Sequence, residues 1–177
     1  VWGACPPVPP ELPRDERQQC AEISVPLDYR KPAGRQITVT ISRIPATDQA
    51  ARRGILLSNP GGPGGSGLDL PSYLATTLPA EVLARYDLIG FDPRGVGAST
   101  PISCDLSPTT PAELILPYPA PDGSIDRNVA FAKATADSCA ATSGDLIPFI
   151  TTANTARDMD RIRTVLGEPR LSYLGYS

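Results

Sequence analysis

The chain has 177 residues, of which 41% are hydrophobic, enough for one domain with a buried core. Its 16 basic and 19 acidic residues give a net charge of −3 without a cluster of Lys or Arg, which argues against a nucleic-acid partner. No segment approaches the roughly 18 apolar residues that a membrane-spanning helix needs, so no membrane span is expected.

Proline is unusually frequent at the start of the chain. The chain has 21 prolines, and they gather in residues 5–13 and again in residues 117–124. Proline fixes its own φ and favours extended backbone in the residue before it, so both stretches are expected to be rigid connectors. We therefore expect a Pro-rich segment at residues 1–19, followed by one domain at residues 20–177.

Four cysteines, Cys5, Cys20, Cys104 and Cys139, show no metal-binding spacing, and the chain contains no histidine. No metal site is therefore expected. Four cysteines allow three pairings into two disulfides. We favour Cys5–Cys20 and Cys104–Cys139 because each pair brackets one irregular or loop-rich segment. Disulfides indicate an oxidising compartment, so the sequence predicts a secreted, extracellular protein whose signal peptide has been removed.

The first half of the chain reads as strands joined by one crossover. Residues 21–29 and 36–46 predict two strands that begin the sheet as an antiparallel pair. Residues 54–59 and 87–92 are short continuous apolar runs, typical of strands buried on both faces. Residues 71–86 between them are long enough for a helical crossover, which would make those two strands parallel.

The second half continues the same alternation. Residues 126–143 are Ala-rich and helical in composition. A second helix is expected to follow a capping box at Thr155 and Asp158 and to end at Gly167. Residues 171–174 then read as a strand. In open α/β sheets ligands bind at the carboxyl ends of strands, so the loops after the last three strands are the candidate functional sites.

The loop SNPGGPGGSG contains a G-x-G-x-x-G match at Gly62, Gly64 and Gly67, which is the pattern of a dinucleotide-binding turn. Pro63 removes one amide from that turn, and the loop follows the third predicted strand, whereas a dinucleotide turn normally follows the first. A Walker-type phosphate loop is excluded because no Lys-Ser or Lys-Thr follows the glycines. An NAD-dependent enzyme therefore remains only an alternative.

The same loop has two other interpretations. It can be a glycine-rich connection that needs positive φ angles. Alternatively, the backbone amides of Gly61 and Gly62 can point at a developing oxyanion.

The loops DPRGVGAST and GYS follow the next two predicted strands in the chain. Arg94 can pair with Asp92 or another carboxylate and hold the first of these loops, in which Gly95 supplies a turn. The second is the first half of the G-x-S-x-G nucleophile elbow, whose strained turn exposes a serine hydroxyl. Ser177 is therefore either a turn residue or a nucleophile.

Taken together, NPGGPGGSG, DLIGFDPRGVGAST and LSYLGYS, with CAEISVPLDYRKP upstream, occur in the order that an α/β-hydrolase requires. Over residues 20–177 the chain resembles the secreted tripeptidyl aminopeptidase family of α/β-hydrolase serine exopeptidases. That family is related to the proline iminopeptidases and to mycobacterial exported serine hydrolases. The implied fold class is α/β, namely the N-terminal half of the mostly parallel α/β-hydrolase sheet.

The resemblance implies a role for each matching residue. Ser177 would be the nucleophile, and Gly62, with Gly61, would offer a backbone amide to the tetrahedral intermediate. Asp92, Arg94 and Gly95 would brace the adjacent loop as scaffold. No cofactor is implied.

The family's triad order is Ser, then Asp or Glu, then His, so both partners would follow Ser177. We expect a second chain or a C-terminal continuation to supply them, together with further strands and a cap domain. The expected activity is that of a secreted aminopeptidase that cleaves peptide or peptide-like substrates from their free N-termini through an acyl-serine. The alternatives are an esterase or small-metabolite amidase of the same fold, and a non-catalytic hydrolase-like binding scaffold.

Overall fold

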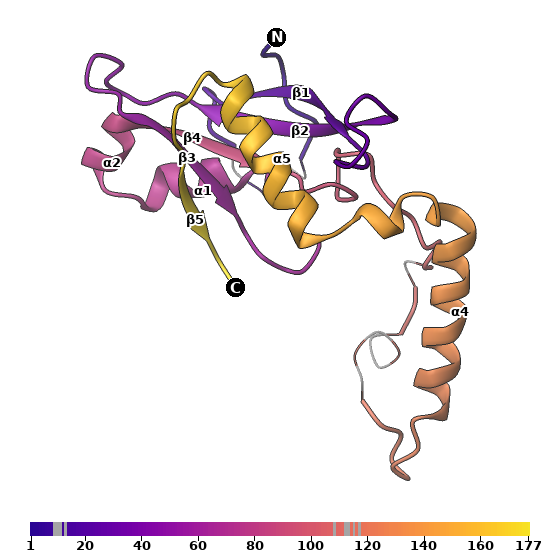
Figure 1. Cartoon of the computed structure of the whole chain (residues 1–177). Coiled ribbons are helices and arrows are strands. Elements are labelled where there is room, and N and C mark those ends of the chain that lie inside the picture. The colour runs from indigo at the N-terminus through magenta and orange to yellow at the C-terminus, as the bar shows by residue number, and fades with distance from the viewer. Residues whose placement is uncertain (9–11, 13, 108, 112–113, 115, 117) are drawn as a thin grey trace. The chain divides into compact units, whose positions relative to one another are not determined.

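The computed structural model describes residues 1–8, 12, 14–107, 109–111, 114, 116 and 118–177. Parts of the Pro-rich stretches, residues 9–11, 13 and 117, lie outside this described set. The elements, labelled in Figure 1, are β1 (Gln19–Pro26), β2 (Gln36–Ile44), β3 (Gly54–Asn59), α1 (Leu70–Thr77), α2 (Ala80–Arg85), β4 (Tyr86–Phe91), α4 (Asp126–Ser143), the 3₁₀ turn η1 (Ile147–Phe149), α5 (Thr152–Val165) and β5 (Ser172–Gly175).

The five strands form one mixed sheet in the order β1-β2-β4-β3-β5. β1 pairs with β2, and β2 with β4, in antiparallel fashion, whereas β3 is parallel to both β4 and β5. The expected antiparallel start and the expected parallel pair of strands are confirmed. The α/β fold class is confirmed as well. Because β3, β4 and β5 run the same way, the loops that follow them leave the sheet at one edge.

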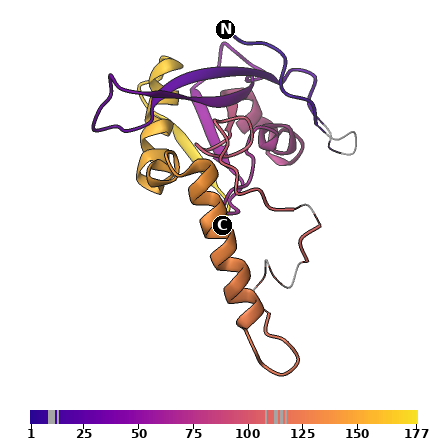
Figure 2. The same cartoon turned by 90° about the vertical axis from the view of Figure 1, so that its right-hand side faces the viewer.

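Helices cover both faces of this sheet. Figures 1 and 2 show α5 on one face and α1 with α2 on the other. On the α1 face, the fully buried Leu74 packs with Ile44 of β2 and Leu88 of β4. On the other face, Ile162 of α5 is completely buried. The apolar residues of β3 and β4 are therefore enclosed from two sides, as their continuous hydrophobic runs predict.

The crossover between β3 and β4 is two short helices, not the single helix expected over residues 71–86. The break falls at Leu78, whose ψ of 149° is extended. Pro79 follows it, and a proline disfavours the helical conformation in the preceding residue.

Helix α5 begins earlier than the expected capping box. Its N-cap is Thr151, whose side chain accepts a hydrogen bond from the amide of Asn154 at 3.2 Å. The expected box at Thr155 and Asp158 is wrong, because Asp158 lies inside the helix and is 1% exposed. Gly167 follows the helix with φ of +75°, which fits the expected glycine at the helix end.

The chain divides into two compact units. One unit holds residues 1–101 with 150–177, and the other holds residues 102–149. The N-terminal segment belongs to the sheet unit because Gly3 exchanges backbone hydrogen bonds of 2.8 and 2.9 Å with Cys20. Residues 102–149 form the second unit, which contains α4 and η1.

Each unit contains one disulfide. Cys5 is bonded to Cys20 in the sheet unit, and Cys104 is bonded to Cys139 in the second unit. These are the pairings favoured from the sequence. None of the helices in the described part of the chain combines the length and apolar character needed to cross a membrane.

Candidate active site

The carboxyl ends of β3 and β5 place the loop SNPGGPGGSG and the GYS segment side by side. We call the first of these, residues 58–67, the glycine loop. In the parallel register Asn59 lies opposite Gly175. The pairing continues one residue further, because the amide of Tyr176 donates to the carbonyl of Asn59 at 3.1 Å. Ser177 therefore leaves the sheet directly beside the start of the loop SNPGGPGGSG.

Gly61 makes the closest approach between these two segments. A Cβ atom at Gly61 would lie 2.5 Å from the carbonyl oxygen of Tyr176 and 2.9 Å from the Cβ of Ser177. Its φ of +84° also favours glycine. No larger residue fits at this position without moving the backbone that carries the serine.

Ser177 itself has a φ of +51°, in the left-handed region that few non-glycine residues adopt. A nucleophile elbow places its serine on such a strained turn, so that the hydroxyl stands clear of the sheet. The Ser177 side chain has no hydrogen-bond partner among the described residues, and the chain contains no histidine. Ser177 therefore has the backbone conformation expected of an elbow serine, and this chain has no histidine to act as its base.

The two predicted amide donors differ in availability. The Gly61 amide already donates to the side-chain oxygen of Asn59 at 2.9 Å. The Gly62 amide has no acceptor within the described ranges, and the next residue, Pro63, has no amide hydrogen. Of the expected pair, Gly62 is thus the donor left free for a ligand, whereas Gly61 provides the close approach to Ser177.

Asp92, directly after β4, connects the glycine loop to the next loop. Its carboxylate is 1% exposed and accepts hydrogen bonds from Ser66 Oγ at 2.6 Å and from the amides of Gly67 and Ala98 at 2.9 and 2.8 Å. It has no ion-pair partner in the part of the chain that the structure describes. Asp92 is therefore held by neutral N–H and O–H donors, and it ties two loops of the site together.

Arg94 pairs with a carboxylate other than Asp92. Its fully buried guanidinium forms two 2.7 Å bonds to the carboxylate of Asp158 on α5. It also donates to the carbonyls of Leu27 and Pro26 at 2.9 and 3.1 Å. One side chain thus joins the loop after β4, helix α5 and the end of β1.

Tyr29 completes this cluster by donating its hydroxyl to Asp158 at 2.7 Å. Burial, followed by this hydrogen bond, raises the pKa of the Tyr29 hydroxyl above its ordinary value. Gly95 lies in the same loop with φ of +84°, and a Cβ there would lie 3.1 Å from the side chain of Ile150. Asp92, Arg94 and Gly95 all contact other parts of the protein, so none of them is available to bind a ligand.

Two side chains that shape the site do not stand out in the sequence. Asn59 orients Gly61, and its place before Pro60 marks it only as a turn residue. Asp158 holds Arg94, but in the sequence it resembles part of a helix cap. Only the folded chain brings Asp158 near Arg94, 64 residues away, whereas Asn59 accepts from the amide two residues on in a local turn. No group of three or more His, Cys, Asp and Glu side chains that could hold a metal ion occurs among the residues described.

Three curated relatives match nearly the whole chain. A tripeptidyl aminopeptidase of Streptomyces lividans is 44% identical over 164 residues, which cover 90% of this chain and 30% of the relative. Serine protease Hip1 of Mycobacterium tuberculosis is 35% identical over 181 residues, covering 99% of this chain and 34% of the relative. Carboxylesterase B of the same species is 37% identical over 166 residues, covering 92% and 32%.

The chain thus spans about a third of the length of these relatives, from 30% to 34%. The family described as the alpha/beta hydrolase fold matches residues 54–177, from β3 to the serine after β5. That range includes all three loops at the carboxyl edge of the sheet. By its strand order, its glycine loop and this match, the chain belongs to the alpha/beta hydrolase fold family.

Proposed function

We propose that the protein is a serine hydrolase with Ser177 as its nucleophile. The observation that carries the proposal is the placement of Ser177 at φ of +51° after β5, directly against the glycine loop after β3. This is the geometry in which an elbow serine and an oxyanion donor from the third strand's loop face one substrate carbonyl.

In the proposed reaction, Ser177 Oγ attacks the substrate carbonyl carbon while a histidine takes the hydroxyl proton. The Gly62 amide and the amide of the residue after Ser177 stabilise the resulting oxyanion. When the intermediate collapses, the bond to the leaving group breaks, and that group receives the proton. Water then hydrolyses the acyl-serine and restores the enzyme.

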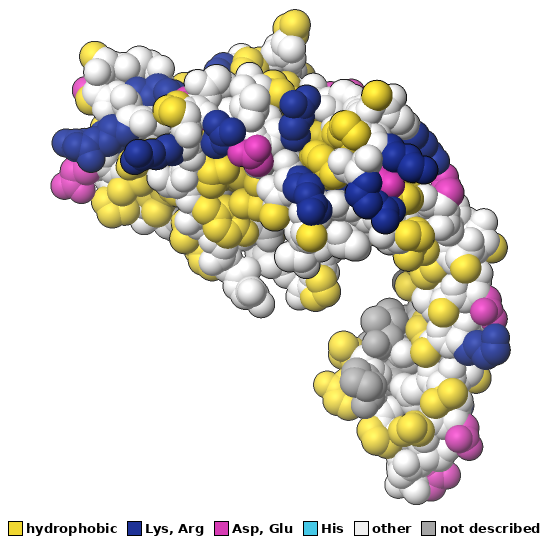
Figure 3. All heavy atoms as spheres, in the orientation of Figure 1, with side chains coloured by type: hydrophobic (Ala, Val, Ile, Leu, Met, Phe, Trp, Pro, Cys, Tyr) yellow, Lys and Arg dark blue, Asp and Glu magenta, His cyan; other side chains and the backbone are white. Residues whose placement is uncertain are grey.

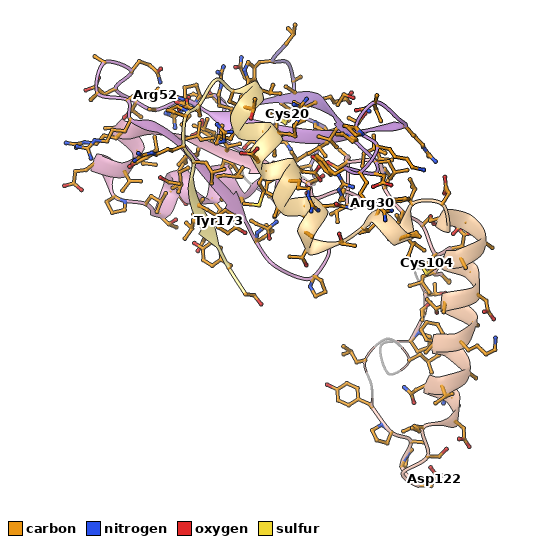
Figure 4. The ribbon with its side chains drawn as sticks, viewed as in Figure 1. Cys20, Arg30, Arg52, Cys104, Asp122 and Tyr173 are labelled. Atoms are coloured by element: carbon orange, nitrogen blue, oxygen red, sulfur yellow. A yellow bond between two sulfur atoms is a disulfide. The ribbon has the colours of Figure 1, made fainter. Side chains whose placement is uncertain are left out.

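The base and its acidic partner are proposed to come from a C-terminal continuation or a second chain. The chain has no histidine and spans about 30% of the Streptomyces relative. Among the described strands, β5 is paired on one side only. Its Tyr173 is 51% exposed and points away from the sheet in Figure 4, and Figure 3 shows hydrophobic side chains gathered around this strand. Further strands and a helix beside β5 would cover that surface.

The finer proposal is an exported aminopeptidase that acts on the free N-terminus of short peptides. Two relatives are named as a tripeptidyl aminopeptidase and a serine protease. The two disulfides fit an oxidising, extracellular compartment.

The experiment uses the full-length protein and a fluorophosphonate probe, with mass spectrometry of the labelled peptide. Labelling is expected on Ser177 and is expected to vanish in Ser177→Ala. The matched control is Ser172→Ala, an exposed serine on the same strand, which is expected to label normally. Labelling elsewhere, or none on folded protein, would refute the serine-hydrolase proposal and favour a binding scaffold.

A second candidate activity is ester hydrolysis, because a further relative is named carboxylesterase B. Peptide amides with free N-termini, their N-acetylated forms and simple esters separate the two activities. An aminopeptidase is expected to lose most of its kcat/KM when the amine is acetylated. An esterase would prefer the ester and would not respond to acetylation.

A further inference from the structure

Residues of the N-terminal segment contact the far end of the glycine loop. Gln18, 7% exposed, donates from Nε2 to the carbonyl of Leu68 at 2.9 Å and to Asp69 Oδ1 at 3.4 Å. Its Oε1 accepts a hydrogen bond from the hydroxyl of Ser72 in α1. Both polar ends of the side chain are therefore used, one on the loop and one on the helix that follows it.

Two residues near Gln18 also form bonds with Asp69 and Ser72. Arg14 forms a 2.7 Å salt bridge with Asp69, and the amide of Asp15 donates to Ser72 Oγ at 2.9 Å. We call Arg14, Asp15 and Gln18 the N-terminal clamp. Since Cys5 is bonded to Cys20, the clamp is enclosed in a disulfide loop anchored on β1.

The glycine loop is thereby held at both ends. At its start, Asn59 accepts the Gly61 amide. At its end, Asp92 accepts the Gly67 amide, and the next carbonyl, that of Leu68, receives hydrogen bonds from Gln18 and from Ser42 Oγ at 2.6 Å. The free amide of Gly62 lies between these two anchors.

We propose that Gln18 is a positioning residue for the oxyanion donor Gly62. The inference rests on the proposed function, because it assumes that Gly62 donates to the oxyanion at Ser177. Stabilisation of an oxyanion requires donors that already point at it before the charge develops, and small displacements of such groups are costly. By fixing the Leu68 carbonyl, Gln18 limits the positions that the glycine loop can adopt.

The contacts of Gln18 require a side chain that both donates and accepts hydrogen bonds. A glutamate of the same shape could not donate from a carboxylate to the Leu68 carbonyl. It would also bring a negative charge beside Asp69, whose Oδ1 lies 3.4 Å from Gln18 Nε2. Gln18→Glu therefore removes one of the hydrogen bonds that hold the end of the loop, while those made by Ser42 and Asp92 remain. It leaves Ser177 and strand β5 unchanged.

The test measures how fast a fluorophosphonate labels Ser177 in full-length protein, as a function of probe concentration. This separates the reversible affinity of the probe from the maximal rate of phosphonylation. Gln18→Glu is expected to lower the maximal rate by about tenfold or more, since loss of an entire oxyanion donor costs on the order of 100-fold or more. The reversible affinity is expected to stay the same. Gln19→Glu, the same change at the next and exposed residue, is expected to leave both unchanged.

Thermal unfolding of each variant reports whether the protein is folded. If Gln18→Glu does not fold, Ser72→Ala serves instead, because it removes the hydroxyl that Gln18 Oε1 accepts. If a folded variant is labelled at the wild-type maximal rate, the positioning role of Gln18 is overturned. The same holds if the maximal rate falls only in proportion to the folded fraction. Either result leaves the proposed function standing. A wild-type protein that is not labelled at Ser177 overturns the proposed function and this inference together.

Discussion

The two ends of the parallel strands differ in how deeply the groups that hold them are buried. At the amino ends, Arg52 forms a 2.9 Å salt bridge with Asp87 of β4 and a second one with Glu168, shortly before β5. At the carboxyl ends, the Asp92 carboxylate is bound by neutral amide and hydroxyl donors. Figure 4 shows Arg52 at the end of the sheet away from the residues that follow Tyr173.

Asp87 also accepts the backbone amide of Ala46 at 2.8 Å, so a carboxylate holds a backbone amide at both ends. The ends differ in burial, because the Arg52 side chain is 26% exposed whereas Asp92 is 1% and Arg94 0% exposed. Ion pairs that reach solvent are screened and contribute little to stability. Hydrogen bonds to particular backbone amides, such as that of Gly67, fix the place of the chain itself. The carboxyl edge, where Ser177 and the free Gly62 amide lie, is held by the buried Arg94–Asp158 ion pair and by the hydrogen bonds of Asp92.

The largest expected effect is at the carboxyl edge, in Arg94→Ala. The substitution leaves the buried carboxylate of Asp158 without its cation, which costs about 3–5 kcal/mol in proteins. Urea unfolding of full-length protein measures the change. Arg30→Ala, which removes an exposed partner of Asp28, is the control and is expected to unfold like wild type. Equal midpoints for the two variants would show that the buried pair is not a brace.

Asp92→Ala is expected to have the next largest effect and to act on both stability and activity. It leaves the amides of Gly67 and Ala98 without their acceptor, at about 1–3 kcal/mol for each buried unsatisfied group. The glycine loop loses an anchor, so the rate of Ser177 labelling should fall in the fraction that remains folded. A folded variant that labels at the wild-type rate would contradict the link between Asp92 and the site.

Arg52→Ala tests the amino end and is expected to cost about 1 kcal/mol or less, since its partly exposed pairs are screened by solvent. The cost should shrink at high salt, and the labelling rate of Ser177 should not change. A loss of labelling in a stable Arg52→Ala protein would remove the distinction between the two ends.

The smallest expected effect concerns Tyr29 and depends on pH. Tyr29→Phe removes the hydrogen bond to Asp158 and is expected to cost about 1 kcal/mol. The folded protein raises the pKa of Tyr29 above its ordinary value of 10.0, so its contribution is fully present below pH 10. It is lost as the pH rises from there through the folded-state pKa. Urea unfolding of both proteins across this range should show the difference narrowing; a difference that widens above pH 10 would contradict the raised pKa.

Much of the fold could be predicted from local patterns. The continuous apolar runs that became β3 and β4, and the helix at Asp126–Ser143, are visible because burial and helical composition are properties of neighbouring residues. The prediction of a single crossover helix was wrong because Pro79 breaks the helix, despite the helical composition of the residues around it. The division at residues 102–149 could not be predicted, since compactness depends on contacts between distant segments.

The candidate site divides in the same way. The glycine loop, DPRGVG and GYS are local motifs, so the sequence by itself determined the residues and their place after three successive strands. Only the tertiary structure decided that Arg94 pairs with Asp158, 64 residues away, whereas the bond from the Gly61 amide to Asn59 belongs to a local turn. The tertiary structure alone shows Gln18 beside the glycine loop. The physical reason is that hydrogen-bond partners far apart in the sequence are chosen by distance and direction in the folded chain, which no local spacing encodes.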